Sequence, residues 1–287
     1  MKVAFIGLGI MGSRMAANLL KNDVELTIFN RSAESMQSLA ELGALMAGSY
    51  QGAVKDADVV FTMLASPEVV AQVALGADGF LASMADDAIW VDCSTVNPAF
   101  SIIAGKVAAQ HHIRFVDAPV AGSKQQAESA ELIFLAGGSE TDIESIDGLL
   151  NMMGSRVVHV GDRGKGAALK MLVNSLLAQS MAAFSEAVLL GEALGLERDF
   201  LLDLLPNSAV CAPFIKAKAE MIRAGDYDVQ FPLELMHKDL HLAALTAYEN
   251  NRPLFSANTA KELFTAAKQG GLGRKDFAAI YDYLRGR

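Results

Sequence analysis

The sequence predicts an α/β domain with a doubly wound, mostly parallel sheet, followed by an all-α domain. In the first half of the chain, short runs of β-branched and aromatic residues alternate with helix-length amphipathic segments. These runs are Val3–Ile6, Glu25–Phe29, Val59–Leu64, Ala88–Val91, Ile113–Val116, Ile133–Leu135 and Val157–Val160. Such alternation is typical of a parallel sheet with helices on both faces, and we expect this domain to span residues 1–163.

The rest of the sequence has the periodicity of helices. Ala, Leu and Met recur there at helical spacing, and strand-like runs disappear. Ala167–Leu194 keeps a helical pattern without proline, and only Gly191 weakens it. Because a helix of this length usually connects two domains, we expect an interdomain helix over 164–194 and an all-helical domain over 195–287.

The composition indicates a folded, globular protein. Of the 287 residues, 52% are hydrophobic and 20% are charged, which is enough apolar material to bury substantial cores and excludes disorder. The 24 Lys and Arg against 33 Asp and Glu give a net charge of −9, without a dense basic run. These features argue against nucleic acid and against an acidic membrane surface as partners.

Two further features bear on the cellular compartment. The uncharged stretch Met171–Ser185 contains Asn174 and Gln179 and is shorter than the ~20 residues that a bilayer requires, so we expect a buried helix there. Cys93 and Cys211 lie far apart in the sequence, which suggests neither a zinc cage nor a disulfide framework. We therefore expect reduced thiols and a cytoplasmic protein.

A glycine motif links the first predicted strand to the first predicted helix. Val3–Ile6 runs directly into Gly7-Leu8-Gly9-Ile10-Met11-Gly12, and a helical pattern follows. Gly7 permits a tight turn, Gly9 lets the backbone approach a pyrophosphate, and Gly12 allows close helix packing, while the helix N-terminus offers N–H groups to phosphates. The motif predicts a Rossmann domain in which these six residues bind a dinucleotide; the alternative is an ordinary glycine-rich turn.

The end of the second predicted strand indicates which dinucleotide binds. NAD sites place an acidic residue there for the ribose 2′-hydroxyl, but this chain has Asn30-Arg31-Ser32. Arg31 can pair with a 2′-phosphate, and Asn30 and Ser32 add neutral donors, so NADP fits better than NAD and NADPH suggests a reductive direction. The alternative is that Arg31 only caps a solvated turn.

Three further blocks appear in the order found in one enzyme family. They are Asp117–Ser123, Gly164–Asn174, and Phe231–Leu233 with Lys238–Leu240. Together with the glycine motif, these blocks resemble those of the β-hydroxyacid dehydrogenase family, which includes 3-hydroxyisobutyrate dehydrogenase-like proteins. The resemblance implies a C-terminal domain like that of 6-phosphogluconate dehydrogenase. Within it, Asn30–Ser32 and the Asp117 block with Lys124 after it look most like the glyoxylate and succinic semialdehyde reductases.

The resemblance implies that Lys170 is the general acid. Reduction of an aldehyde places a hydride on carbon while a proton reaches the developing alkoxide, so a positioned acid is needed beside the nicotinamide. Asn174 lies four residues later on the same helical face and could bind substrate or orient the amine. The alternative for Lys170 is a snorkelling lysine on an amphipathic helix.

The resemblance also implies the remaining site residues. Those expected at the substrate are Thr95, Gly122, Ser123 and Asp239, and those expected at the cofactor are Met63, Leu64, Ser66, Thr95, Phe231 and Lys238. Several of them follow predicted strands, at the edge where open α/β sheets bind ligands. The alternatives are loop capping for Thr95, Gly122 and Ser123, turn formation for Ser66, and a solvated charge pair for Lys238 and Asp239. His237 and His241 are spaced like metal ligands, but a third ligand is not evident and hydride transfer needs no metal.

Two positions depart from the pattern of those reductases. Ala121 stands where they usually carry Ser, and Ala130 where they usually carry Gly. Loss of a hydroxyl beside the substrate carboxylate removes a hydrogen bond worth about 0.5–1.5 kcal/mol, or somewhat more toward an anion. We therefore hypothesise weaker use of glyoxylate than these reductases show, with Ser123 as the residue that could take over the contact.

These observations favour NADPH-dependent reduction of a small carboxylated aldehyde of the glyoxylate or succinic semialdehyde class. An alternative is an NAD(P)-dependent 3-hydroxyisobutyrate or tartronate semialdehyde type of dehydrogenase that works oxidatively. Imine reductases share the architecture but usually lack a lysine at the position of Lys170, and a non-enzymatic nucleotide-binding module would typically have lost it. The resemblance further implies a homodimer or homotetramer.

Overall fold

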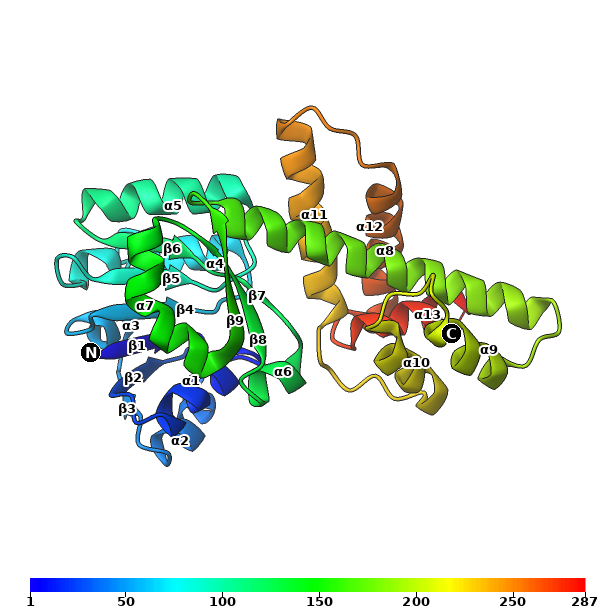
Figure 1. The fold of residues 1–287 in the computed structure, drawn as a ribbon, viewed down its shortest axis with the longest axis horizontal. Coiled ribbons are helices and arrows are strands. Elements are labelled where there is room, and N and C mark those ends of the chain that lie inside the picture. Colours follow the sequence, from blue (N-terminus) through cyan, green and yellow to red (C-terminus); the bar gives the residue numbers. More distant parts are fainter. Residues whose placement is uncertain (287) are drawn as a thin grey trace. The chain divides into compact units, whose positions relative to one another are not determined.

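The computed structural model describes residues 1–286, which form two compact units, one that ends at Lys170 and one that begins at Met171 (Figure 1). The first unit is an α/β domain, and the second is helical. One long helix, α8 (Lys165–Ala193), begins in the first unit and continues into the second. The predicted fold class is therefore confirmed.

A nine-stranded, mostly parallel sheet forms the centre of the first unit. Its strands are β1 (Val3–Ile6), β2 (Leu26–Phe29), β3 (Leu45–Met46), β4 (Val59–Thr62), β5 (Ile89–Asp92), β6 (Arg114–Asp117), β7 (Val120–Ala121), β8 (Leu132–Gly137) and β9 (Gly154–Gly161). The order is β3-β2-β1-β4-β5-β6-β8-β7, with β9 paired to β8. Only β8 runs antiparallel to β6 and β7; the other pairs are parallel. The two-residue strands β3 and β7 were not predicted, because so short a segment has no periodicity.

Helices cover both faces of this sheet (Figure 1). They are α1 (Gly12–Lys21), α2 (Glu34–Ala40), α3 (Tyr50–Val54), α4 (Pro67–Val70), α5 (Pro98–Gln110), α6 (Lys124–Glu128) and α7 (Glu140–Met153). Side chains alternate along a strand, so Phe5 and Phe61 pack into one core, with α1 and α7, and Ile6 and Trp90 pack into another, with α5. The strands are apolar on both faces for this reason.

The second unit packs five shorter helices around the greater part of α8. They are α9 (Arg198–Leu204), α10 (Ile215–Ala224), α11 (Leu233–Glu249), α12 (Phe255–Ala267) and α13 (Ile280–Leu284). Met181 and Val188 of α8 lie in the core of this unit. Packing explains why a glycine stands at position 191 within the helix, because a β-carbon there would lie 2.5 Å from the Leu201 side chain.

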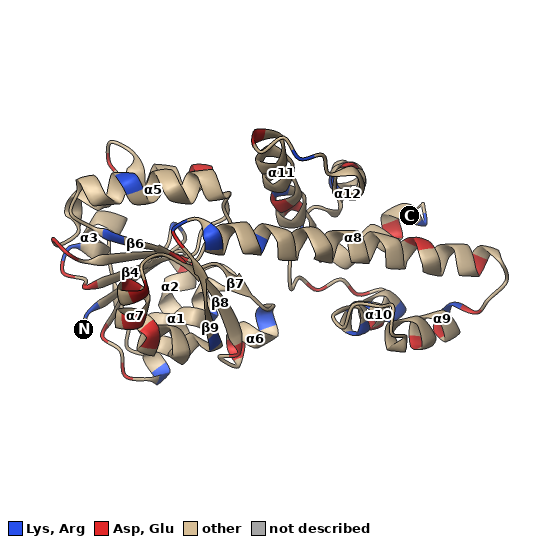
Figure 2. Ribbon diagram, turned by 45° about the horizontal axis from the view of Figure 1, so that its top comes forward, with Lys and Arg blue, Asp and Glu red and all other residues tan. Residues whose placement is uncertain are grey.

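The helix α8 is long and apolar enough, by length and composition alone, to cross a membrane. Figure 2 shows that it is largely uncharged, with basic residues near its start and acidic ones toward its end. However, Lys170 and Asn174 are buried within it, and one face of the helix, with Met181 and Val188, belongs to the core described above. These features favour the core helix that the sequence predicts over a membrane span.

A buried ion pair stabilises the second unit. Lys218 on α10 lies 2.8 Å from Asp276, and both side chains are almost fully buried. Asp276 also accepts hydrogen bonds from the backbone N–H groups of Gln230, Phe231 and Ala278. One carboxylate thus links α10 to the loop before α11.

We expect Lys218→Met to lower the free energy of unfolding by about 3 kcal/mol, because breaking a buried pair leaves an uncompensated charge. The three N–H donors that remain on Asp276 keep the loss at the low end of the usual range. Lys261→Met, which removes a pair with the exposed Glu262, should cost less than about 1 kcal/mol. Urea denaturation measures both values, and equal losses would contradict the prediction.

Candidate active site

The glycine motif forms a tight loop between β1 and α1. Gly7 has a φ of +97°, and a β-carbon there would overlap the Met63 carbonyl oxygen. A β-carbon at Gly12 would overlap the Gly7 carbonyl oxygen, whereas Gly9 has no atom of residues 1–286 near that position. The loop is thus closed on the protein side and open at Gly9, and α1 carries no acidic residue in its first turn. This arrangement fits the pyrophosphate of a dinucleotide.

The turn after β2 holds the glycine loop in place. The backbone N–H of Leu8 donates to Asn30 Oδ1 at 3.1 Å, and Asn30 Nδ2 donates to the Ser32 carbonyl at 3.2 Å. One N–H of the Asn30 amide is thus engaged within the protein, and the expected contact of Asn30 with the cofactor stays a prediction. Arg31 and Ser32 are exposed, and Arg31 makes no hydrogen bond or ion pair with the described residues. Arg31 is the one cation among the three residues of this turn.

A buried polar network joins the ends of β4 and β5. Thr62 Oγ1 donates to Asp92 Oδ1 at 2.8 Å and accepts from Trp90 Nε1 at 2.9 Å. Asp92 also accepts the N–H of Ser94, whose hydroxyl oxygen accepts the N–H of Leu64 at 2.9 Å. The network ties together the two loops that follow these strands.

These loops carry the residues expected near the nicotinamide. Met63, Leu64 and Thr95 are partly exposed beside the network. The Ser66 hydroxyl accepts the Val69 N–H at 3.4 Å and so caps α4, which matches the turn alternative for this residue. Sequence reasoning missed Thr62, Asp92 and Ser94, although a polar residue at the end of an apolar strand was a visible signal.

The predicted substrate turn follows β7. Gly122 has a φ of +128°, which suits glycine, and packs against Leu132 and Gln126. The N–H and the hydroxyl of Ser123 both donate to Gln126 Oε1, at 2.9 and 2.6 Å, in a capping box that begins α6. Both Ser123 donors are thus engaged within the turn, and the expected substrate contacts of Gly122 and Ser123 stay predictions.

The departure at Ala130 concerns the backbone. Ala130 has a φ of +56°, in the left-handed region that favours glycine. The residue stands in the turn before β8, and a glycine would relieve strain at this position.

We expect Ala130→Gly to raise the free energy of unfolding by about 1 kcal/mol, because the left-handed conformation costs about that much for alanine. Catalytic rates should not change. The control is Ala109→Gly on the exposed face of α5, which should lower stability instead. Thermal denaturation checks both, and a loss of stability at position 130 would show that the turn is not strained.

Asp117 ends β6 beside the start of α8. Its two carboxylate oxygens accept the N–H groups of Gly164 and Ala167, at 2.6 and 2.8 Å. Burial, with a smaller contribution from Asp92, raises the pKa of Asp117 to about 7 although these backbone bonds lower it. Asp117 was not singled out within its block, because the helix start that it binds lies 47 residues later in the chain.

The helix α8 carries two buried polar residues one turn apart. Lys170 is 8% exposed and Asn174 is fully buried. Asn174 Nδ2 donates to Asp239 Oδ2 at 2.6 Å, and among residues 1–286 no donor reaches Asn174 Oδ1. A buried acceptor without a partner costs about 1–3 kcal/mol, so this oxygen is suited to a ligand that brings a donor.

Asp239 and Lys238 lie side by side on α11. The Asp239 carboxylate is buried, and Lys238 Nζ lies 2.8 Å from its Oδ1. Since its other oxygen holds the Asn174 amide, Asp239 orients that amide. Phe231, before α11, stacks edge-on against Phe277, with 5.7 Å between ring centroids.

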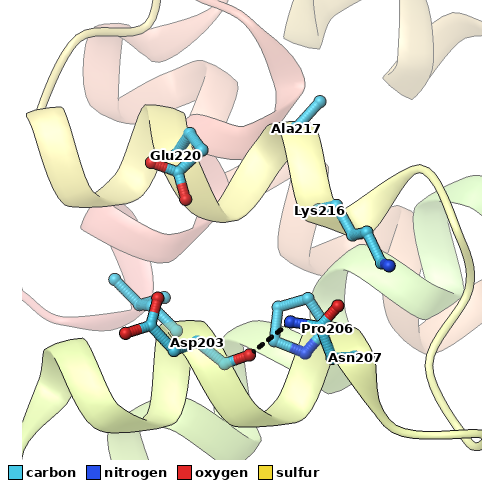
Figure 3. Close-up of a pocket in the computed structure, with 7 residues that line it drawn as sticks. Asp203, Pro206, Asn207, Lys216, Ala217 and Glu220 are labelled. Atoms are coloured by element: carbon cyan, nitrogen blue, oxygen red, sulfur yellow. Dashed lines mark hydrogen bonds between the residues drawn. The ribbon is translucent and has the colours of Figure 1, made fainter.

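The histidines and the surface groove add no further site. Among residues 1–286, no three His, Cys, Asp or Glu side chains are grouped to hold a metal ion. Burial and nearby cations lower the pKa of His237. An open groove between α9 and α10 contains none of the motif residues (Figure 3); its lining is Leu202, Asp203, Pro206, Asn207, Lys216, Ala217 and Glu220.

Two protein families match almost all of this chain. Residues 2–161 match the NAD binding domain of 6-phosphogluconate dehydrogenase. Residues 164–284 match the family described as the NAD-binding domain of NADP-dependent 3-hydroxyisobutyrate dehydrogenase.

Individual proteins are similar over almost all of this chain. Glyoxylate/succinic semialdehyde reductase 2 of Arabidopsis thaliana, a chloroplastic protein, is 35% identical over 99% of this chain and 79% of its own. The 2-(hydroxymethyl)glutarate dehydrogenase of Eubacterium barkeri is 36% identical over 97% and 93%. The structure of Mycobacterium tuberculosis 3-hydroxyisobutyrate dehydrogenase with L-serine has a TM-score of 0.89, with 29% identity over 99% of both chains.

Proposed function

Since this chain belongs to the β-hydroxyacid dehydrogenase family of NAD(P)-dependent oxidoreductases, we propose that it reduces a small carboxylated aldehyde with NADPH. The aldehyde would be of the glyoxylate or succinic semialdehyde class. The observation that carries this proposal is the pair of buried polar residues on α8, Lys170 and Asn174, with an acceptor on Asn174 left for a ligand.

Lys170 acts as the general acid in this proposal. A nicotinamide cofactor bound beside the substrate would supply the hydride for the carbonyl carbon. Lys170 Nζ gives a proton to the carbonyl oxygen as negative charge develops there, and Asn174 Oδ1 accepts a hydrogen bond from the new hydroxyl group. Asp239 keeps the Asn174 amide in the orientation that this requires.

The substrate carboxylate would lie against Thr95 and the backbone of Gly122. Thr95 is partly exposed beside the β5 loop, and the Gly122 turn is held by the Ser123–Gln126 capping box. Because the Ser123 donors are occupied and Ala121 has no hydroxyl, we retain the hypothesis that glyoxylate is used less well than in the similar reductases.

We expect Lys170→Ala to lower kcat by roughly 10²–10⁴-fold, which is the usual contribution of a general acid. Lys165→Ala, an exposed lysine at the start of the same helix, is the matched control and should keep kcat. The assay is NADPH consumption with glyoxylate, succinic semialdehyde, methylmalonate semialdehyde and tartronate semialdehyde. Full activity in Lys170→Ala would remove this mechanism, and no activity in the native protein would favour a nucleotide-binding module.

The exposed Arg31 supports NADP as the cofactor. A guanidinium pairs with a 2′-phosphate, and no carboxylate ends β2 to bind a ribose 2′-hydroxyl. The family match to an NADP-dependent 3-hydroxyisobutyrate dehydrogenase agrees with this.

We expect Arg31→Ala to raise KM for NADPH about 10–100-fold, because a hydrogen bond to a charged group contributes about 1.5–3 kcal/mol. KM for NADH, which lacks the phosphate, should change little. Arg156→Ala, which removes an exposed arginine of β9, serves as the control. An equal rise of KM for NADPH and for NADH would show that Arg31 does not bind the 2′-phosphate.

A second candidate is oxidation of a 3-hydroxyisobutyrate-type substrate with NAD(P)⁺. It is favoured by the similarity to the Mycobacterium tuberculosis 3-hydroxyisobutyrate dehydrogenase. Initial rates in both directions, with 3-hydroxyisobutyrate and with the aldehydes above, distinguish the two candidates.

We also propose a homodimer or homotetramer in the cytoplasm. The exposed leucines Leu172, Leu176 and Leu190 on α8 support the assembly, because apolar surface of this kind is often covered by another copy. Cys93 and Cys211 are both free thiols, which suits a reducing compartment.

A further inference from the structure

The carboxylate of Asp117 binds the first turn of α8 with both of its oxygens. Oδ1 accepts the Gly164 N–H at 2.6 Å, and Oδ2 accepts the Ala167 N–H at 2.8 Å. The side chain is 1% exposed, so water cannot replace it in these bonds. The end of β6 therefore fixes where α8 begins.

Two glycines press this helix start directly against the sheet. A β-carbon at Gly166 would overlap the Leu135 carbonyl oxygen and lie 2.8 Å from the Asp117 carbonyl oxygen. A β-carbon at Gly137 would lie 2.8 Å from Asp117 Oδ1 and from the Gly166 nitrogen. With no spare space on either side, the first turn of α8 has one position relative to β6 and β8.

The same turn determines the position of Lys170. Ala167, which donates to Asp117, is three residues before Lys170 on one continuous helix, so the two lie on the same face. A displacement of the first turn moves the Lys170 ammonium with it. Misplacement of a reacting group by about 1 Å can cost about 10²-fold in rate.

We propose that Asp117 is a positioning residue: it holds the start of α8 so that Lys170 is placed for proton transfer. This inference rests on the proposed role of Lys170 as general acid. Both Asp117 carboxylate oxygens are engaged by the backbone of α8, so its effect on catalysis would be exerted through Lys170.

The carboxylate of Asp117, beside Asp92 of β5, also predicts a pH dependence of kcat. Burial, with a smaller contribution from Asp92, its partner in the register of β5 and β6, raises the pKa of Asp117 to about 7. Protonation removes the negative charge that strengthens both bonds to the α8 N–H groups and turns one oxygen into a donor. In the native protein, kcat should therefore fall as the pH drops below about 7, and this limb should be absent in Asp117→Asn.

The first test compares Asp117→Asn with Ser139→Ala. An asparagine offers one acceptor, so one N–H of α8 loses its partner; we expect kcat to fall about tenfold or more, with KM for NADPH within about twofold. Hydrogen exchange at residues 164–167 should become faster. Ser139→Ala removes the N-cap of α7 in the same unit, which carries no expected site residue, and should lower Tm without lowering kcat.

A kcat for Asp117→Asn that is no lower than for Ser139→Ala would overturn the proposal. If Asp117→Asn does not fold, Gly137→Ala is the second variant, because it pushes on the same carboxylate and keeps its charge. It should lower kcat in the same direction, and an unchanged kcat with faster exchange at residues 164–167 would equally overturn the proposal.

A readout without activity separates this inference from the proposed function. Acetic anhydride labels lysines according to their accessibility and protonation, and mass spectrometry gives the ratio of Lys170 to Lys165 labelling. If Lys170→Ala keeps full activity, the proposed function fails, and labelling still tests the positioning. A changed ratio in Asp117→Asn supports the placement of Lys170 by Asp117, and an unchanged ratio overturns it.

Discussion

The parallel register of β4, β5 and β6 is the constraint on which the first unit's part of the candidate site depends. It places Thr62, Asp92 and Asp117 opposite one another at one edge of the sheet. Buried in an apolar core, these groups need hydrogen bonds, and they find them in the loops and the helix that follow the strands. The hydrogen bonds that these buried side chains require thus fix the positions of the loops that line the site and of the start of α8.

Much of the fold was predictable because it depends on local periodicity. The strand and helix alternation before residue 160 and the unbroken helical pattern of Ala167–Leu194 are properties of the sequence alone. The roles of Asp92 and Asp117 were not predictable in the same way. A terminal aspartate has the same sequence signature whether it faces water or a helix that begins dozens of residues later.

The candidate site was predicted unevenly for the same reason. The four-residue spacing of Lys170 and Asn174 is local, whereas the engagement of Asn30 by Leu8 depends on how β2 pairs with β1. Ser123 is different, because Ser123 and Gln126 have the spacing of a capping box, a signal that was readable in the sequence. The strain at Ala130 required the backbone angle, which no residue type specifies.

The continuity of α8 limits where segments of two related proteins can be recombined. Lys170 is the last residue of the first unit and Asn174 lies in the second, yet both are on one uninterrupted helix. A chimaera that joins two relatives in the middle of this helix would combine an amine from one parent with an amide from the other. A working recombinant should instead inherit residues 165–193 as one block, together with the α11 aspartate that orients the amide.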